Sequence, residues 1–156
     1  MEEEALTLNA HNKAEYPPMH TCEHILNQTM VRMFGCGRSK DAHIERKKSK
    51  INYDLPEEPT GEQVAEIARR VNEVIAADLP VTYEYVGRGA VPAGVPLDRL
   101  PGAAEDTLRL VRVGDYDVCA CIGAHVEHTA QIGTFHINST SYRDGRFRIV
   151  FKLLDS

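Results

Sequence analysis

Two stretches of the chain carry apolar residues at helical spacing. Between residues 19 and 34, Ile25, Met30 and Met33 fall mostly on one face, and glycines follow, so this stretch is predicted to be a helix. The polar residues before it end in two prolines. Residues 1–18 are therefore predicted to form a short lead-in strand or coil that stops at the prolines.

A second amphipathic run extends through Asp78. Thr60 stands at its N-cap position, and Gln63 occupies the capping-box position three residues later. The apolar stripe of this run predicts a packing face and consists of Val64, Ile67, Ala68, Val71, Val74 and Ile75. The run is predicted to be a helix that ends before Pro80.

Alternating apolar and polar residues predict strands over much of the remaining chain. They are expected at 81–86, 108–113, 116–122, 133–140 and 146–154, with one or two more between 38 and 53 joined by a turn near 47–49. Asp144-Gly145 is a strong signal for a hairpin turn. The segment 87–107 is expected to be a loop, either a lid or a tolerated insertion. The pattern predicts an α+β fold, with two main helices packed on a mostly antiparallel sheet.

Composition places the chain among ordinary globular proteins. It has 156 residues, 42% of them hydrophobic and 26% charged, so we expect one domain spanning 1–156. The acidic N-terminus does not resemble a signal peptide, and no apolar run reaches the length of a membrane span, so a cytoplasmic protein is expected by elimination. The net charge of −5 argues against a general nucleic-acid binder but leaves room for one basic face. The oligomeric state stays open.

Two pairs of metal-ligating residues stand far apart in the sequence. His20 and His24 lie one helical turn apart and project from one face of the predicted helix. Cys121 ends a predicted strand, and Gly123 permits a turn that brings His125 back toward it. Three imidazoles and one thiolate suit zinc, so the two pairs predict a shared Zn²⁺ site.

Neighbouring residues leave alternatives around this site. Cys119 shares a strand face with Cys121, but we interpret it as a small buried residue. His128 is a ligand, a proton shuttle or, by default, a surface residue. Glu23 completes the order H-x-x-E-H of a class of zinc peptidases, in which the glutamate is the general base, so a zinc peptidase is the alternative function. A binding module with purely structural zinc is a further alternative.

The paired motif carries a family resemblance. His20-x-x-x-His24 followed by C-x-x-x-H-x-x-x-T-x-x-I-G from Cys121 to Gly133 resembles the editing domain of alanyl-tRNA synthetase, its free-standing relatives and the editing domain of threonyl-tRNA synthetase. The likeness runs from about His20 to Leu154, and the chain resembles the short free-standing kind. It implies that His20, His24, Cys121 and His125 bind the metal. It also implies hydrolysis, in trans, of the ester bond that links a wrongly attached serine or glycine to the alanine tRNA.

The resemblance also has departures and suggests further site residues. Ala124 and Gln131 stand where the family usually has Thr and Glu, and no threonine occurs between Met30 and Pro59 to read a serine hydroxyl. The expected acid or base groups are Glu23 and His43, and the expected substrate contacts are Ser39, Thr129 and Gln131. Ser39, His43 or Ser49 would take the place of the missing threonine. The expected partner is mischarged tRNA, contacted through the basic cluster at 38–50 and the hairpin, above all through Arg46, Lys47, Lys48 and Arg143. The basic cluster could equally be a solvated sheet edge.

Overall fold

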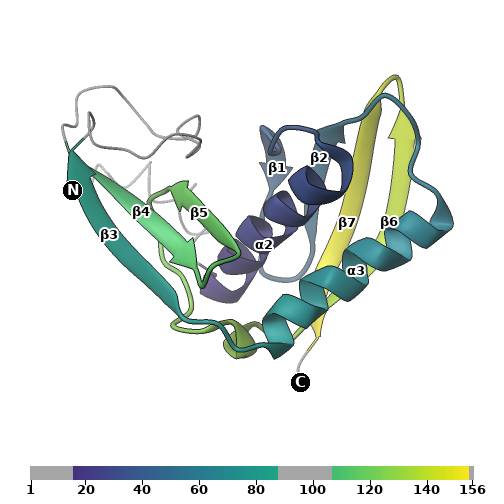
Figure 1. Cartoon of the computed structure of the whole chain (residues 1–156). Helices are drawn as coiled ribbons and strands as arrows, with labels where there is room; N and C mark the ends of the chain where they lie inside the picture. Colours follow the sequence, from purple (N-terminus) through teal and green to yellow (C-terminus); the bar gives the residue numbers. More distant parts are fainter. Residues whose placement is uncertain (1–15, 88–106, 155–156) are drawn as a thin grey trace, which may run out of the picture.

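The computed structural model describes residues 16–87 and 107–154. These residues form two helices of several turns and seven strands, an α+β arrangement, as predicted (Figure 1). The helices are α2 (Pro17–Phe34) and α3 (Gly61–Ala76), and a short 3₁₀ helix, η2, spans Thr129–Ile132. Neither α2 nor α3 is long and apolar enough to cross a membrane. Residues 1–15, 88–106 and 155–156 lie outside the described part. They include all of the predicted loop at 87–107 except Gly87 and Thr107, which are the end of β3 and the beginning of β4.

Helix α2 begins at the prolines, which corrects the prediction that a lead-in segment runs to residue 18. Pro17 and Pro18 occupy the first helical positions, where the missing N–H is no loss and the fixed φ favours the helix. The helix ends at Gly35, whose φ of 68° is left-handed and whose N–H donates to the carbonyl of Val31. Residues from Met19 to Asn27 are all buried because α2 lies between the two sheets (Figure 1).

Helix α3 confirms the predicted capping box. The Thr60 hydroxyl accepts from the N–H of Gln63 at 3.1 Å, and the Gln63 side chain accepts from the N–H of Thr60 at 2.8 Å. The helix ends at Ala76, just before the predicted end at Asp78. Its apolar stripe packs on α2 and on the face of the larger sheet, while its other face is exposed and carries arginine–glutamate pairs.

The larger sheet has four antiparallel strands in the order β1-β2-β7-β6. Its strands are β1 (Asp41–His43), β2 (Ser49–Asp54), β6 (Thr134–Arg143) and β7 (Arg146–Leu154), with β6 and β7 joined by the predicted Asp144-Gly145 turn. One face packs under α2 and α3, and its core includes Phe135, Phe147, Ile149 and Phe151. Because side chains alternate along β7, the residues between these point away from the helices.

A second, separate sheet has three antiparallel strands in the order β3-β4-β5. These are β3 (Val81–Gly87), β4 (Thr107–Val113) and β5 (Asp117–Ala120). The predicted α+β fold with antiparallel strands is confirmed, and the strands are divided between two sheets, because alternation identifies strands but not their partners. Strand β5 also ends before the predicted Ile122, so Cys121 lies in the turn that follows it. Helix α2 runs between the two sheets (Figure 1).

Candidate metal centre

Four side chains from the two predicted pairs meet at one point. Four ligand atoms lie within 4.8 Å of one another, one each from His20, His24, Cys121 and His125. Helix α2 supplies the two histidines one turn apart, and the segment after β5 supplies the thiol and the third imidazole. His20 and His24 are buried, whereas Cys121 and His125 are half-buried, so the accessible side of the cluster lies over the latter two.

Two of the rings are oriented by bonds at their outer nitrogen. Nδ1 of His20 lies 3.0 Å from the carbonyl oxygen of Ala124, to which only a ring N–H can donate. Nδ1 of His125 lies 2.9 Å from the Thr21 hydroxyl, which also accepts the N–H of Val126 at 3.2 Å. With the proton on Nδ1, each ring keeps its Nε2 lone pair for the centre of the cluster. Nε2 of His125 is buried and has no hydrogen-bond partner, and Nε2 of His20 lies 3.3 Å from the Cys121 sulfur.

The third ring faces a buried carboxylate. Nδ1 of His24 lies 3.5 Å from Oδ2 of Asp117, an ion-pair distance that is too long for a hydrogen bond. Asp117 is itself held by Arg38 at 2.8 Å and by the Gln28 amide at 3.0 Å, and its side chain is fully buried. A histidine backed by a carboxylate is the usual outer arrangement of a protein zinc site.

The turn that carries Cys121 is fixed from the neighbouring strand. Arg109 on β4 donates to the carbonyl of Cys121 at 3.0 Å and to that of Gly123 at 2.7 Å. Gly123 has a φ of 103°, and a Cβ there would lie 2.9 Å from the His20 ring. Only glycine therefore satisfies both the backbone conformation and the close approach of the ring.

The charges in the cluster favour a thiolate. Burial alone would raise the pKa of Cys121, but hydrogen bonds to His20 and His24 outweigh it and lower that pKa to about 6. Burial would lower the pKa of His24, but Asp117 and Cys121 raise it to about 9. Burial, together with His20, His24 and Arg109, holds the pKa of His125 far below its ordinary value. A neutral imidazole and a thiolate are the forms that bind metals, so Cys121 and His125 favour the ligand form, whereas His24 has to release a proton when a metal binds.

The donor set and its spacing fit a metal ion. Three imidazole nitrogens and a thiolate suit zinc by ligand softness. Bond lengths of about 2.0–2.3 Å in a tetrahedron place ligand atoms about 3.3–3.6 Å apart. The 3.3 Å between Cys121 and His20 agrees with this value. The four ligand atoms lie within 4.8 Å of one another, so the widest pair has to close by about 1 Å to reach the tetrahedral spacing. Nε2 of His125 is buried without a hydrogen-bond partner, which also fits a metal ion at this point.

Replacing Gly123 tests how tightly the turn is built. Gly123→Ala is expected to weaken zinc binding about 10–100-fold, the usual cost of disturbing the support of a metal ligand, because the new methyl displaces His20. Zinc affinity is measured by competition with a chromogenic chelator. Gly37→Ala is the matched control, since a Cβ at Gly37 meets nothing within 4 Å. Equal affinity in the two variants would contradict this description of the turn.

The expected acid or base groups lie elsewhere. Glu23 is buried on α2. Together with burial, it raises the pKa values of Cys22, Tyr53 and Cys119. It is not one of the four clustered ligands. His43 is exposed on β1, paired with Lys50 at the edge of the larger sheet. The structure thus does not bring either residue into the four-residue cluster.

Two of the expected substrate contacts have structural partners. Thr129 is fully buried, and its hydroxyl accepts the N–H of Leu79 at 2.8 Å and donates to the carbonyl of Val74 at 3.0 Å, so it joins η2 to the end of α3. The Gln131 side chain caps η2 by accepting from the N–H of Glu127 at 2.8 Å.

The remaining candidates on this side of the sequence are also engaged. Ser39 is buried, and its hydroxyl bonds the backbone of Asp41. Ser49 is buried and bonds the backbone of Glu45. Cys119 is buried, as predicted, and burial raises its pKa to about 12. His128 is partly exposed and forms an ion pair with Asp78.

The expected tRNA contacts lie on the larger sheet. Arg46, Lys47 and Lys48 are exposed in the turn between β1 and β2, and the Arg46 guanidinium lies 4.8 Å from the ring centre of Tyr16. Arg143 is at the end of β6, with 91% of its side chain exposed.

Several residues that support the ligands were not predicted from the sequence. These are Thr21, Arg38, Asp117 and Arg109, which hold the ligands, and Tyr83, whose ring centre lies 6.3 Å from that of His125. Asp117 left a signal, since it is a lone charge in an otherwise apolar strand that leads into the motif. The others had none, because their partners are distant in the chain.

Comparison with known proteins locates the same region. Residues 108–150 match the family described as the threonyl and alanyl tRNA synthetase second additional domain. An alanine–tRNA ligase from Halorubrum lacusprofundi is 34% identical over 147 residues, or 92% of this chain. Those from Natronomonas pharaonis and Treponema denticola are 33% and 28% identical over 88% and 87% of the chain.

The match covers a limited part of these relatives. The chain spans 15% of the length of the ligases from Halorubrum and Natronomonas and 23% of the length of that from Treponema. The similarity therefore concerns one region of a much longer protein.

Proposed function

We propose that this chain, which is similar to part of alanine–tRNA ligases and to the threonyl and alanyl tRNA synthetase second additional domain, is a zinc-dependent deacylase of mischarged aminoacyl-tRNA. Its substrate would be serine or glycine esterified to the alanine tRNA, presented in trans. Water adds to the ester carbonyl carbon, the ribose oxygen leaves as a hydroxyl, and the free amino acid is released. Such a step is needed where a synthetic site cannot exclude a near-isostere by more than a few kcal/mol.

One observation carries the proposal. In a chain related to a synthetase domain, His20, His24, Cys121 and His125 converge on one point, and the outer nitrogen of each ring faces a partner. When bound there, zinc would supply Lewis-acid polarisation of the ester carbonyl or of a water molecule. The chain itself supplies the orientation, since Asp117, Arg109 and Thr21 hold the ligands.

The accessible side of the centre offers contacts for the end of a tRNA. Tyr83 lies beside His125 with 43% of its surface exposed, and the Arg109 guanidinium lies 4.6 Å from the centre of its ring. An exposed aromatic ring stacked with a guanidinium is a suitable surface for a nucleobase. We assign the terminal base of the tRNA to Tyr83, and backbone contacts to Arg46, Lys47 and Lys48.

Deacylation of defined substrates tests the proposal. The zinc-loaded chain is mixed with seryl-, glycyl- and alanyl-esters of the alanine tRNA, and release of the amino acid is followed in time. The seryl or glycyl ester is expected to be hydrolysed well above its spontaneous rate, and the correct alanyl ester much more slowly. His20→Ala is expected to lose this activity, while His136→Ala, which changes an exposed histidine of β6, is expected to keep it.

Failure of the zinc-loaded, folded wild type to exceed the spontaneous rate on any of the three esters would refute the proposal. The peptidase alternative has less support, because the fourth clustered ligand is a thiol from a turn and Glu23 is outside the cluster. Hydrolysis of peptides that disappears in Glu23→Gln would reinstate it. A structural role for zinc would be indicated by full zinc binding without hydrolysis of any ester.

Substitution of Tyr83 tests the assigned base contact. Tyr83→Leu is expected to raise KM for the mischarged tRNA about 5–150-fold, the equivalent of the roughly 1–3 kcal/mol that stacking on an aromatic ring supplies per base. Its kcat is expected to change little, because the side chain does not hold a ligand. Tyr83→Phe keeps the ring and is expected to behave like the wild type. A KM unchanged in Tyr83→Leu would remove the base contact from this residue.

A further inference from the structure

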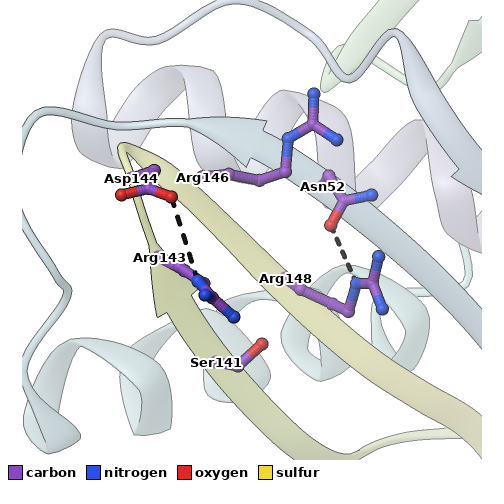
Figure 2. A pocket seen from close by; sticks show the side chains of 6 residues that line it. All are labelled: Asn52, Ser141, Arg143, Asp144, Arg146 and Arg148. Carbon is purple, nitrogen blue, oxygen red and sulfur yellow. Dashed lines mark hydrogen bonds and ion pairs between the residues drawn. The ribbon is translucent and has the colours of Figure 1, made fainter.

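A polar hollow lies on the larger sheet, on the face turned away from the helices. It has a volume of about 480 Å³ and is lined by Asn52, Ser141, Arg143, Asp144, Arg146 and Arg148. Figure 2 shows these side chains on the neighbouring strands β2, β7 and β6, with Asp144 in the turn between β6 and β7. Phe147 and Ile149 of β7 point into the core, so the alternation of the strand turns Arg146 and Arg148 outward. We call this site the arginine hollow.

The arginine hollow brings like charges together at a cost. Arg143 and Arg146 are direct cross-strand partners, and like charges in that position destabilise a sheet. Arg146 has a carboxylate partner in Asp41 at 3.0 Å, whereas Arg143 lies 3.9 Å from Asp144 with both side chains more than nine-tenths exposed. Asp54 of β2 is the cross-strand partner of Arg146 and lies on the same face. Three guanidinium groups thus share this face with three carboxylates, and the one close ion pair among the described residues here is that between Arg146 and Asp41.

The third arginine is held in place by a neutral group. Nε of Arg148 donates to the Asn52 amide oxygen at 3.0 Å, and the Asn52 amide nitrogen donates to Asp41 at 3.0 Å. The bond to Asn52 uses only Nε, so both terminal amino groups of Arg148 make no hydrogen bond to another described residue. A guanidinium fixed at Nε with a free terminal edge is prepared to receive a phosphate oxygen.

The positive charge continues along the same face. Lys152 follows two positions after Val150 on β7, and Lys50 pairs with Val150 from β2, so alternation places both on the outer side. None of the exposed large apolar side chains of the described residues lines the hollow, which disfavours a membrane or an apolar protein partner. In a chain of net charge −5, this is a local concentration of cations on an open surface.

We propose that the arginine hollow binds phosphate groups of an RNA backbone. The identification of that RNA as tRNA rests on the proposed function. An extended polyanion fits an open row of cations on a sheet better than a single small anion, which a closed pocket would hold. The hollow is on the face of the larger sheet turned away from α2, whereas the metal ligands come from α2 and the segment after β5, so the two sites would contact different parts of the RNA. Substitutions in the hollow thus change RNA affinity and not the hydrolytic step.

Binding of uncharged, fluorescently labelled tRNA by the zinc-loaded full chain tests this proposal without requiring hydrolysis. In the double variant Arg143→Gln/Arg148→Gln, affinity at moderate salt is expected to fall roughly tenfold or more. The slope of log affinity against log salt is expected to fall by about 1.4–1.8, the value for two lost phosphate contacts. Arg112→Gln is the control, because Arg112 is a strand arginine of the other sheet that pairs with Glu84 at 3.0 Å.

A second readout separates binding from folding. Because the substitutions remove like-charge repulsion, the double variant is expected to unfold at the same temperature as the wild type or higher at low salt. Unchanged tRNA affinity and salt slope would overturn the proposal, and so would an equal loss in Arg112→Gln. If the double variant lost only a response to inorganic phosphate, the hollow would be a small-anion site and the RNA assignment would be wrong.

The outcome is independent of the proposed function. A wild type that binds tRNA through the hollow but hydrolyses no ester would leave this inference standing and refute the deacylase. A chain that hydrolyses mischarged tRNA with the same KM in the wild type and the double variant would do the reverse.

Discussion

Cys121→Ala is expected to abolish both zinc binding at micromolar metal and hydrolysis of the mischarged ester. The side chain is the single thiolate among the four clustered ligands, and the pKa of about 6 makes it ionised at neutral pH. Loss of an outer partner of a metal ligand lowers metal affinity by about 10–100-fold. Loss of a direct ligand should lower it by more. Zinc affinity and single-turnover hydrolysis are measured on the same preparations.

Metal removal gives this prediction a stability readout. At free zinc about 1,000 times the dissociation constant, the bound metal stabilises the fold by about 4.1 kcal/mol. For a chain of this length, that corresponds to about 8–16 °C in Tm. A chelator should lower the Tm of the wild type by this amount and leave that of Cys121→Ala unchanged. Cys36→Ala, at a half-buried cysteine outside the cluster, should respond like the wild type. A similar chelator shift in Cys121→Ala would contradict the assigned centre.

Asp117→Asn is expected to have the second largest effect, and it acts through two partners. The substitution keeps the shape of the side chain but removes the charge that faces His24 and pairs with Arg38. The Arg38 side chain is only 14% exposed, so an unpaired charge there should cost about 3–5 kcal/mol, or about 6–20 °C in Tm. Zinc affinity should fall a further about 10–100-fold, because the orientation of His24 is lost.

A double substitution separates the two effects of Asp117. Arg38→Met combined with Asp117→Asn removes both buried charges and is expected to recover much of the lost stability, since the uncompensated cation is gone. Zinc affinity should stay low, because His24 still lacks its carboxylate. Recovery of zinc affinity together with stability would mean that Asp117 acts only on the fold.

The ligand pairs could be predicted from sequence because each pair is local. The spacing from His20 to His24 fixes a common helix face, and Gly123 between Cys121 and His125 signals the turn. The joining of the two pairs came from the family resemblance and from ligand softness. The capping box of α3 and the hairpin turn at Asp144-Gly145 were predictable for the same local reason.

The supporting residues depend on tertiary contacts that no local pattern encodes. Arg109 reaches the Cys121 turn from a neighbouring strand, and Arg38, in the segment between α2 and β1, pairs with Asp117 of β5. The division into two sheets was unpredictable because alternation assigns a face, not a partner. Thr129 was expected to contact the substrate, yet its hydroxyl is hydrogen-bonded to the end of α3. Its position in the sequence motif gave no indication of this contact.

Zinc content of the purified chain tests the central claim most directly. Elemental analysis of the wild type, His24→Ala and Cys121→Ala, purified without chelators and then equilibrated with zinc and desalted, compares the centre with two single-ligand losses. Near-stoichiometric zinc in the wild type and little in both variants is the predicted result. Equal zinc in all three proteins, or none in a folded wild type after equilibration, would contradict a metal centre built from these four residues.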